Sequence, residues 1–372
     1  MDADVVVVGA SVAGCATALN LARRGQHVIV VDRATFPRDK PCGEGILPHG
    51  VDELRALGLY DRVAPLGRPF HGIGYHVDAI AAVGRFPKGA GLGIRRLVLD
   101  EALQAVVREA GVDLRLGVSV TATAVDADGV TVTTDAGPLR ARLLIGADGL
   151  HSQVRRAIGA HVRESGEPRF GARWHVELRE DLPVHDVVDV YLCDKFEVYV
   201  TPVGGRVVNL AVLCGREVSR TFGGDLPGAL ARLVRTVPDL AAYTDGARDV
   251  SVAAMAGPLR QTARTLVADR VMLVGDAAGF VDAITGEGMS LSLLGARLAA
   301  ETAAVALKSD RLTASAIAPY EVAQRGAARD IARFTDLVLW WSRRRWLARP
   351  VVCAFSASPA LFGRVLGFAN RG

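Results

Sequence analysis

The stretch from Arg270 to Ala300 holds the residues best suited to chemistry. An apolar run at 271–274 predicts a strand, and Gly275-Asp276, Gly286-Glu287-Gly288 and a long Ala/Leu-rich helical pattern follow it. A strand that leads through a Gly-rich turn into a helix N-terminus forms an anion site, because free N–H groups and the helix dipole point at the ligand. The Asp276 carboxylate could accept hydrogen bonds from a polyol. The pattern indicates a binding site for an electron-accepting ring with a sugar-like tail, which suggests flavin.

A second Gly-rich turn follows the first strand. The run Val5–Val8 is continuous and β-branched, as expected of a buried parallel strand, and GASVAG follows at Gly9 to Gly14. The next strand ends at Asp32, at the spacing where a carboxylate takes the ribose hydroxyls of a dinucleotide. Ser11 replaces the usual middle glycine, but its small hydroxyl can still admit a pyrophosphate. The pattern predicts a dinucleotide site that includes Gly9, Ser11, Ala13, Gly14, Asp32 and Arg33.

The loop Lys40–Gly45 offers further polar groups. Cys42 could be a nucleophile or redox thiol, or a small side chain where the backbone passes close to a cofactor. Lys40 could pair with a phosphate or be solvated, and Gly43 belongs to the same close approach. Glu44 could face a substrate or cap the following turn. Further along, Arg96 begins an amphipathic helical pattern, where it could reach cofactor phosphates or remain exposed.

Composition sets the bounds of these interpretations. The chain has 372 residues, 50% of them hydrophobic and 40 of them glycine, which suits a two-domain α/β protein. The net charge of +4 is spread out, so we expect no nucleic-acid partner. The five cysteines show no paired spacing, which argues for a reducing, cytoplasmic location and against a metal site. We expect no signal peptide and no membrane span.

The elements that must position these residues alternate between two units. Strands predicted within 112–146, together with the two Gly-rich turns, place a Rossmann-like unit at 1–67, 94–165 and 259–312. Residues 68–93 and 166–258 read as a β-sheet substrate domain, with one helix from Phe222 to Tyr243 and a last strand from Val250 to Ala254. Residues 313–372 read as a C-terminal helical region.

Three motifs in this order resemble a known superfamily. GASVAG with Asp32, GADGLHSQVR at 146–155 and VGDAAGFVDAITGEGMS at 274–290 are similar to fingerprints of the para-hydroxybenzoate-hydroxylase-like flavoproteins. That superfamily includes FAD-dependent monooxygenases and geranylgeranyl reductases. The resemblance implies FAD, with NAD(P)H as a transient reductant because no second dinucleotide fingerprint exists. It implies that Asp276 binds the ribityl chain and that Asp148 supports the pyrophosphate and nicotinamide. The remaining cofactor residues implied are Val120, Gly275, Gly286, Gly288 and Met289.

The substrate pocket is less defined in the sequence. In this superfamily the substrate sheet covers the flavin, so its aromatic residues are candidates for the lining. His71, His76 and His175 could serve as bases, but a lone strand histidine is usually structural, and we name no catalytic residue. The pocket candidates are Glu44, Trp174, Tyr191, Tyr199, Pro202 and Phe280.

These observations favour a flavoprotein monooxygenase of secondary metabolism that uses O2 to hydroxylate or epoxidise a lipophilic aromatic or alkene substrate. The loop PCGEG and the segment TGEGMS favour instead an ene-reductase of the geranylgeranyl reductase type. A flavin-carrying binding protein without turnover is a third hypothesis. Near the C-terminus, Trp340, Trp341 and Trp346 alternate with arginines, which suits either peripheral membrane contact or a helical cap over the substrate domain.

Overall fold

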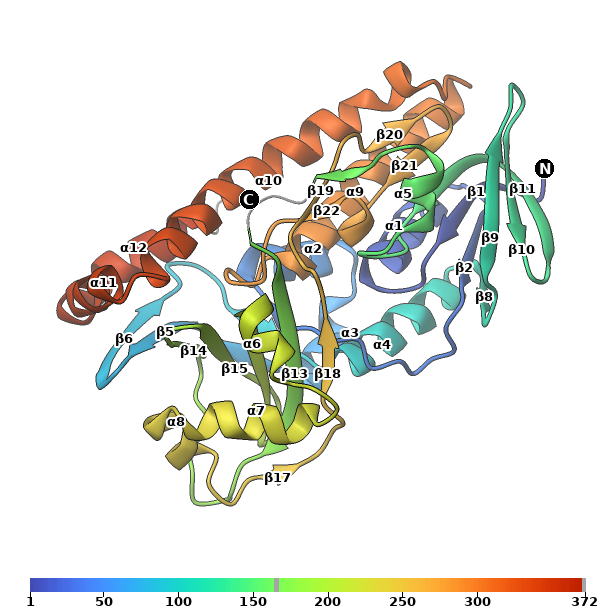
Figure 1. Cartoon of the computed structure of the whole chain (residues 1–372). Coiled ribbons are helices and arrows are strands. Elements are labelled where there is room, and N and C mark those ends of the chain that lie inside the picture. Colours follow the sequence, from blue (N-terminus) through green and yellow to red (C-terminus); the bar gives the residue numbers. More distant parts are fainter. Residues whose placement is uncertain (164–166, 370–372) are drawn as a thin grey trace.

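The protein contains two large β-sheets joined by a long helix. The computed structural model describes residues 1–163 and 167–369. Within them, two eight-stranded sheets lie in different halves of the molecule, and α10 (Ala314–Ser342) runs from one half to the other (Figure 1). The α/β class predicted from the sequence is confirmed, with a Rossmann-like unit, a β-sheet unit and C-terminal helices. The predicted boundaries at 165 and 166 lie outside the described residues.

The first sheet supplies the dinucleotide unit. Its order is β20-β21-β11-β1-β2-β8, and the β21, β11, β1, β2 and β8 neighbours pair in parallel. β9 and β10 add an antiparallel extension to β11. The central strands are buried, which explains their unbroken β-branched sequences. The strands are β1 (Ala3–Val8), β2 (Val28–Asp32), β8 (Asp113–Leu116), β9 (Val120–Val125), β10 (Val130–Thr134), β11 (Gly137–Gly146), β20 (Val267–Ala268) and β21 (Val271–Leu273).

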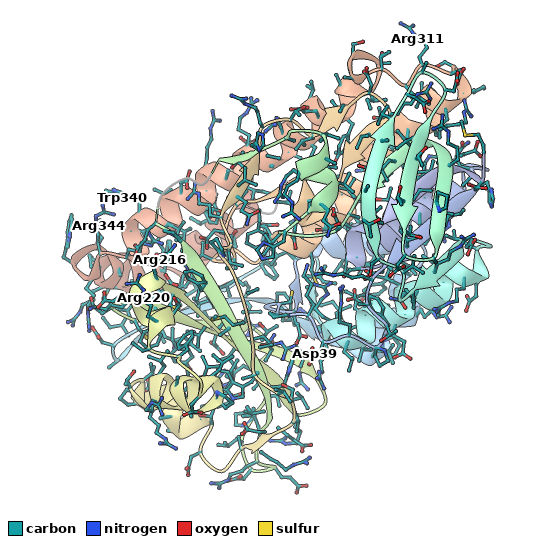
Figure 2. All side chains as sticks on the ribbon, turned by 45° about the vertical axis from the view of Figure 1, so that its right-hand side comes forward. Asp39, Arg216, Arg220, Arg311, Trp340 and Arg344 are labelled. Atoms are coloured by element: carbon teal, nitrogen blue, oxygen red, sulfur yellow. The ribbon has the colours of Figure 1, made fainter. Side chains whose placement is uncertain are left out.

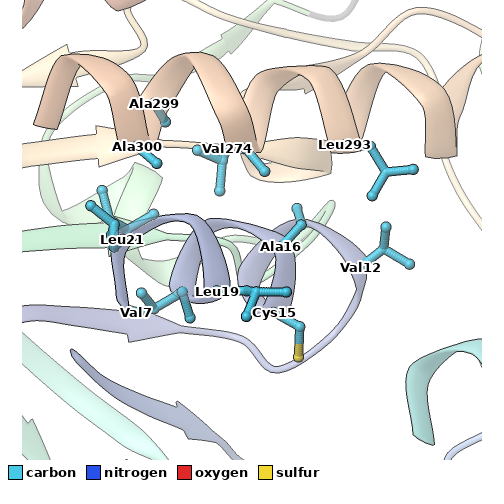
Figure 3. Packing of buried hydrophobic residues seen from close by; sticks show 14 of the residues in the cluster. Val7, Val12, Cys15, Ala16, Leu19, Leu21, Val274, Leu293, Ala299 and Ala300 are labelled. Atoms are coloured by element: carbon cyan, nitrogen blue, oxygen red, sulfur yellow. The ribbon is translucent and has the colours of Figure 1, made fainter. Parts of the chain in front are cut away.

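Helices α1 and α9 pack together against one face of this sheet (Figure 3). α1 (Val12–Ala22) follows the first Gly-rich turn, and α9 (Gly288–Lys308) follows the second. Small residues such as Ala16, Ala299 and Ala300 allow close approach, and Leu19 and Leu293 fill the remaining space. The two turns, far apart in the sequence, are thereby brought to the same edge. The other helices of this unit are α2 (Pro48–Ala56), α3 (Tyr60–Val63), α4 (Arg96–Glu109) and α5 (Gln153–Ala157).

The second sheet forms the unit that the sequence predicts to bind substrate, called the substrate unit below. Its order is β17-β13-β16-β15-β14-β5-β6, with β18 paired to β13, and all neighbours except β14 and β5 run antiparallel. Two three-stranded sheets, β3-β7-β4 and β12-β19-β22, connect the units. The strands of the large sheet are β5 (Gly72–Val77), β6 (Ile80–Arg85), β13 (Arg169–Glu177), β14 (Val188–Leu192), β15 (Phe196–Gly204), β16 (Val207–Gly215), β17 (Arg248–Asp249) and β18 (Ala254–Ala256). Those of the small sheets are β3 (Gly45–Ile46), β4 (Arg68–Phe70), β7 (Gly91–Gly93), β12 (Val162–Arg163), β19 (Gln261–Ala263) and β22 (Gly279–Phe280).

Two predictions for the outer face of this sheet were wrong. The single helix expected over Phe222–Tyr243 is two helices, α7 (Leu226–Arg235) and α8 (Pro238–Tyr243), because Pro238 cannot continue a helix and begins a new one. A short helix, α6 (Arg216–Arg220), precedes them. The strand expected at 250–254 is replaced by the two short strands β17 and β18, and the residues between them are not in a strand.

The C-terminal helices close the substrate unit. After α10, α11 (Arg345–Ala357) and α12 (Pro359–Ala369) pack on β5 and β6 through Val352 and Phe362, beside Trp341 at the end of α10. Contrary to expectation, α9 is long and apolar enough for a membrane span by length and composition, and α11 with α12 would pass the same test as a pair bent by 106°. However, 61% of the α9 window is buried inside the protein. Its apolar composition is explained by its place in the core.

Candidate flavin and substrate site

One large cavity lies between the two units. It receives the N-termini of α1 and α9, the loop 40–45 and the inner face of the second sheet. Its empty volume is about 1700 Å³, including the part open to solvent. Its lining runs from the N-termini of α1 and α9 to the apolar inner face of the second sheet, so the predicted cofactor contacts and an apolar wall share one cavity.

The first Gly-rich turn is built for close backbone approach. Gly9 has a φ of +111°, and a Cβ on Gly14 would lie 1.7 Å from the Gly9 carbonyl oxygen. Ser11 and Arg96 adjoin this turn: Arg96 Nη2 donates to Ser11 Oγ at 2.5 Å, and both side chains contact the buried Asp100 carboxylate. Ser11, Ala13 and Arg96 line the cavity, as the dinucleotide hypothesis requires.

Both helix N-termini fit an anionic ligand. The N-cap residues of α1 and α9, Ser11 and Glu287, make no side-chain capping hydrogen bond, and neither helix has an acidic residue in its first turn. Backbone N–H groups at these termini therefore remain available to a ligand in the cavity. Gly286, Gly288 and Met289 all line it. FAD, which carries a pyrophosphate and an electron-accepting ring, matches two such termini in one cavity.

Asp276 lies in the turn η2 (Gly275–Ala277), before α9. Lys40 Nζ donates to Asp276 Oδ2 at 2.8 Å, so the loop 40–45 is tied to this turn. Burial alone would raise the pKa of Asp276, but the charge and hydrogen bond of Lys40 outweigh it and hold the pKa below its ordinary value. Gly275 lies behind Asp276 against Ala13 and does not line the cavity. The ionised carboxylate fits the predicted contact with a polyol.

The adenosine end of the predicted site lies beyond this cavity. The Asp32 carboxylate accepts from the backbone N–H groups of Ala10 and Ala34, both at 2.8 Å, at the end of β2. Arg33 is exposed beside it, and Val120 begins the neighbouring strand β9. None of the three lines the cavity. They remain predictions for the adenosine portion of the cofactor.

The structure gives Asp148 a different place from the one expected. Its carboxylate accepts from Ser152 Oγ at 2.5 Å and from the backbone N–H of Gln153 at 2.6 Å, and so caps the start of α5. The neighbours of Asp148 line the cavity, but Asp148 does not. Its support of the pyrophosphate and nicotinamide stays a prediction, which could act only through the loop and α5 that Asp148 holds. Arg155 of α5, which sequence reasoning left without a role, donates to Ala277 O at 3.1 Å and supports the Asp276 turn.

The remaining half of the cavity is apolar and is lined by the inner face of the second sheet. Tyr199 belongs to it, and its hydroxyl donates to Ile284 O at 3.1 Å, in the loop before α9. Phe280, Cys42, Gly43 and Glu44 also line the cavity. Sequence reasoning missed most of this apolar wall. It includes Ile73, Tyr75, Val190, Ala211, Leu213 and Phe334.

Three of the predicted pocket residues do not line the cavity. Trp174 and Tyr191 are buried on the other face of the sheet, in the core beneath α7 and α8. Pro202 lies in β15 with its carbonyl oxygen against Gly93. The side-chain period of a strand is two, so a strand directs only alternate residues to one face, and Trp174 and Tyr191 belong to the other set.

The structure also shows where the three histidines considered as catalytic bases lie. His71 is exposed and does not line the cavity. His76 pairs with Asp189 at 2.7 Å and stacks on Tyr191. His175 is fully buried against Glu44. Among the described residues, no group of three or more His, Cys, Asp or Glu side chains could hold a metal ion, and the five cysteines are free thiols.

Comparison with known proteins agrees with this site. A family model for the FAD binding domain matches residues 2–335. Menaquinone reductase of Mycobacterium tuberculosis is 33% identical over 328 residues, covering 80% of this chain and 76% of that protein. Digeranylgeranylglycerophospholipid reductase 2 of Methanopyrus kandleri is 28% identical, covering 86% and 82%. Rifampicin monooxygenase of Rhodococcus hoagii is 28% identical, covering 80% and 64%.

A solved structure has the same fold over nearly the whole chain. The flavoprotein/dehydrogenase from Cytophaga hutchinsonii superposes with a TM-score of 0.85 at 20% identity, covering 98% of this chain and 92% of its own. Enzyme relatives favour turnover over the flavin-carrying binding protein that the sequence left open. The chain therefore belongs to the FAD-binding flavoprotein family of monooxygenases and geranylgeranyl reductases, and it is an FAD-dependent oxidoreductase.

Proposed function

We propose that this protein reduces carbon–carbon double bonds in the isoprenoid chain of a lipid, with FAD as hydride carrier and NAD(P)H as reductant. The observation that carries the proposal is the apolar wall of the cavity, next to the predicted flavin-binding site at the N-termini of α1 and α9. The lining residues on β5, β14 and β16 are all uncharged, and five of the six are aliphatic. Such a wall suits a hydrocarbon chain. Arg173 of β13 also lines the cavity, but its guanidinium is paired with Asp39 at 2.5 Å.

Two relatives support this choice of substrate class. Their names specify a menaquinone and a digeranylgeranyl lipid. These molecules share one chemical part, a chain of unsaturated isoprene units, whereas their head groups differ. A cavity that recognises the shared part would be lined by apolar side chains, as this one is. This reasoning reverses the order of preference drawn from the sequence, which placed monooxygenation first.

The residues of the chain have definable tasks in such a reaction. FAD, once reduced by NAD(P)H, would supply a hydride equivalent to one carbon of the double bond, and a proton from solvent would complete the reduction at the other carbon. The helix N-termini and Asp276 hold the cofactor, while Tyr199 fixes the loop that leads into α9 by its bond to Ile284 O. The apolar wall excludes water and orients the chain against the ring. These are contributions of binding and orientation, and the redox chemistry belongs to the cofactor.

The product mass tests the proposal. Purified FAD-loaded protein would be incubated with NADPH or NADH and with menaquinone or geranylgeraniol, both without oxygen and under labelled O2. After any quinol has been reoxidised to the quinone, the expected product retains a gain of two hydrogens per reduced chain double bond, and it forms in the absence of oxygen. A product that gains one labelled oxygen, and forms only with O2, would refute the reduction.

That second outcome defines the other candidate function, monooxygenation of a lipophilic aromatic or alkene. The specific observation in its favour is the similarity to rifampicin monooxygenase, which matches 80% of this chain. The same cavity would then admit an aromatic substrate beside the ring. The labelled-oxygen experiment separates the two reactions directly.

We also propose that an anionic lipid surface contacts the Trp–Arg surface, defined as Trp340, Trp346, Arg343, Arg344 and Arg349. Trp340 and Trp346 are 51% and 72% exposed, and the three arginines are exposed. Figure 2 shows Trp340 and Arg344 side by side at the surface. Aromatic rings with arginines suit the head-group region of a membrane. The apolar cavity reaches Phe334 on α10, the helix that carries Trp340. Flotation with phosphatidylglycerol vesicles should recover the protein, and phosphatidylcholine vesicles or the variant Trp340→Ala/Trp346→Ala should recover less. Equal recovery in all cases would contradict this contact.

A further inference from the structure

A buried hydrogen-bond network joins the loop 40–45 to the substrate sheet. It centres on the Glu44 carboxylate, which is 0% exposed at the edge of the cavity. Oε1 accepts from the backbone N–H of Arg96 at 2.8 Å, and Oε2 lies 2.5 Å from His175 Nε2 and 3.1 Å from Asn209 Nδ2. These partners belong to α4, β13 and β16. Three elements from both units therefore contact one side chain of the loop 40–45, called the flavin loop below.

The donor and acceptor roles follow from the partners. Asn209 Nδ2 faces two acceptors, the Glu44 carboxylate and the Cys42 carbonyl oxygen at 2.7 Å, so both of its protons are used. Ser251 Oγ accepts the backbone N–H of His175 at 2.9 Å and lies 2.8 Å from His175 Nδ1. A hydroxyl can donate or accept at Nδ1, whereas a carboxylate can only accept, so a ring proton lies on Nε2 and is directed at Glu44. The carboxylate thus accepts three hydrogen bonds and donates none.

The backbone of Glu44 is held in an unusual conformation. Its φ is +61°, in the left-handed region that residues other than glycine rarely adopt. Its carbonyl oxygen accepts from Ile94 N at 3.0 Å, and its N–H donates to Cys42 Sγ at 3.4 Å. Backbone conformations of this kind persist only where the surroundings over-determine them, and they cluster at functional sites. Here the surroundings are the network itself.

We propose that Glu44 is the positioning residue of the flavin loop. Held by His175 and Asn209, it sets where Cys42 and Gly43 lie between the cofactor seat and the substrate sheet. Glu44 acts through the loop on the groups that contact the ligands. Its effect on turnover rests on the proposed reduction of isoprenoid double bonds, whereas its effect on the bound flavin does not.

Replacing Glu44 with glutamine is the sharpest test, because the side chain keeps its size and loses only the pattern of acceptors. If Oε1 of the glutamine faces Arg96 N, its amide protons face the amide protons of Asn209. If the amide is turned round, its protons face the Arg96 N–H. In both orientations a buried donor meets a donor, whichever ring nitrogen of His175 carries the proton, so we expect the loop to move.

The experiment measures kcat, KM, FAD affinity and the visible absorption and circular dichroism of the bound flavin. For Glu44→Gln we expect kcat to fall roughly 10- to 100-fold, because a displacement of about 1 Å at a reacting site can cost that much. KM and FAD affinity should change far less, and the flavin dichroism should change shape. An unchanged kcat with an unchanged flavin spectrum would overturn the proposal.

The matched control is His76→Asn, which breaks another His–carboxylate pair of the same sheet. His76 Nε2 lies 2.7 Å from Asp189 Oδ1 and does not line the cavity, so this variant should lower stability and leave kcat and the flavin spectrum unchanged. If Glu44→Gln does not fold, Ser251→Ala removes the hydroxyl that contacts both the backbone N–H and Nδ1 of His175, and it should produce a smaller change of the same kind. A change in the control equal to that in Glu44→Gln would also overturn the proposal. Absence of double-bond reduction by the unaltered protein would refute the proposed function, and the flavin spectrum would still report on Glu44.

Discussion

Replacing Gly14 with alanine tests the dinucleotide site, because the structure and helix propensity predict effects of opposite sign on stability. Gly14 lies within α1, and a glycine in a helix interior is less stable than alanine by roughly 0.5–1 kcal/mol. Helix propensity alone would therefore make Gly14→Ala stabilising. The structure predicts the reverse, because the new Cβ would lie 1.7 Å from Gly9 O and 2.9 Å from Gly9 C. Both of these are backbone atoms, so no side chain can turn aside to make room.

The magnitude follows from that overlap. A Cβ–oxygen contact closer than about 3 Å is not tolerated, so α1 and the turn must move apart by more than an ångström. Overpacking of this kind costs about 1–3 kcal/mol, which exceeds the helix-propensity gain of up to about 1 kcal/mol. The same movement separates the N-terminus of α1 from the pyrophosphate position. Each 1.4 kcal/mol of binding free energy lost raises Kd tenfold, and we expect the Kd for FAD to rise at least tenfold.

The assay is titration of apo-protein with FAD by fluorescence quenching, with thermal unfolding measured in parallel. Gly326→Ala is the control: it is the same change in a helix, α10, at a position where a Cβ would meet nothing within 4 Å. That variant should be slightly stabilised and bind FAD normally. If Gly14→Ala matches Gly326→Ala in both Tm and Kd, the reasoning about this turn is wrong.

Three further changes test other parts of the site. Lys40→Met removes the charge that lowers the pKa of Asp276 and leaves burial to raise it, so the Tm difference from the unaltered apo-protein should be full at neutral pH, where Asp276 is ionised in both proteins, and should shrink on acidification. A difference that does not vary with pH would contradict this. Ala211→Phe narrows the cavity at its apolar wall and should weaken binding of long isoprenoid substrates by about 0.8 kcal/mol per displaced methylene, while FAD affinity stays unchanged. An equal loss of affinity for a short allylic alcohol would argue against a wall that binds the chain. The hydrogen bond that His185 makes to the Asp189 carboxylate raises the pKa of His185 against the opposing effect of burial. The stability that His185 contributes should therefore be present below about pH 6.5 and be lost as pH rises through the raised pKa. Proton NMR titration of His185, with the Tm of His185→Gln measured from pH 5 to 8, checks this.

Much of the cofactor site could be predicted from the sequence because its chemistry is local. Gly9, Ser11 and Gly14 act through the turn in which they lie, and the helix that follows brings its N-terminus with it. Gly288 and Met289 do the same at α9. A turn, a helix start and a strand end are each specified within a few residues, so their types and spacing are enough to recognise them.

Asp148 shows where this local reasoning stops. Its motif predicted a cofactor contact, but the carboxylate caps α5, and only Ser152 and Gln153 four and five residues later explain why. The capping geometry is local too, yet it competes with ligand contact for the same oxygen atoms. The motif could not show which of the two partners Asp148 takes.

The substrate wall depended on the tertiary structure for a different reason. Alternation along β13 and β14 separates two sets of side chains, but both faces of this sheet are buried, one against the cavity and one beneath α7 and α8. Both sets are therefore apolar, and Trp174 and Tyr191 could not be distinguished from true lining residues by composition.

By itself the sequence determined the α/β class, the two Gly-rich turns and the FAD-type dinucleotide site, since strands, turns and helix starts are encoded by short stretches of chain. Only the tertiary structure decided which face of the second sheet meets the flavin seat, and that Glu44, His175 and Asn209 share one network. Residues 44, 175 and 209 are far apart in the sequence, and no local rule connects them. They meet because sheet register and domain packing bring three separate elements to the same loop.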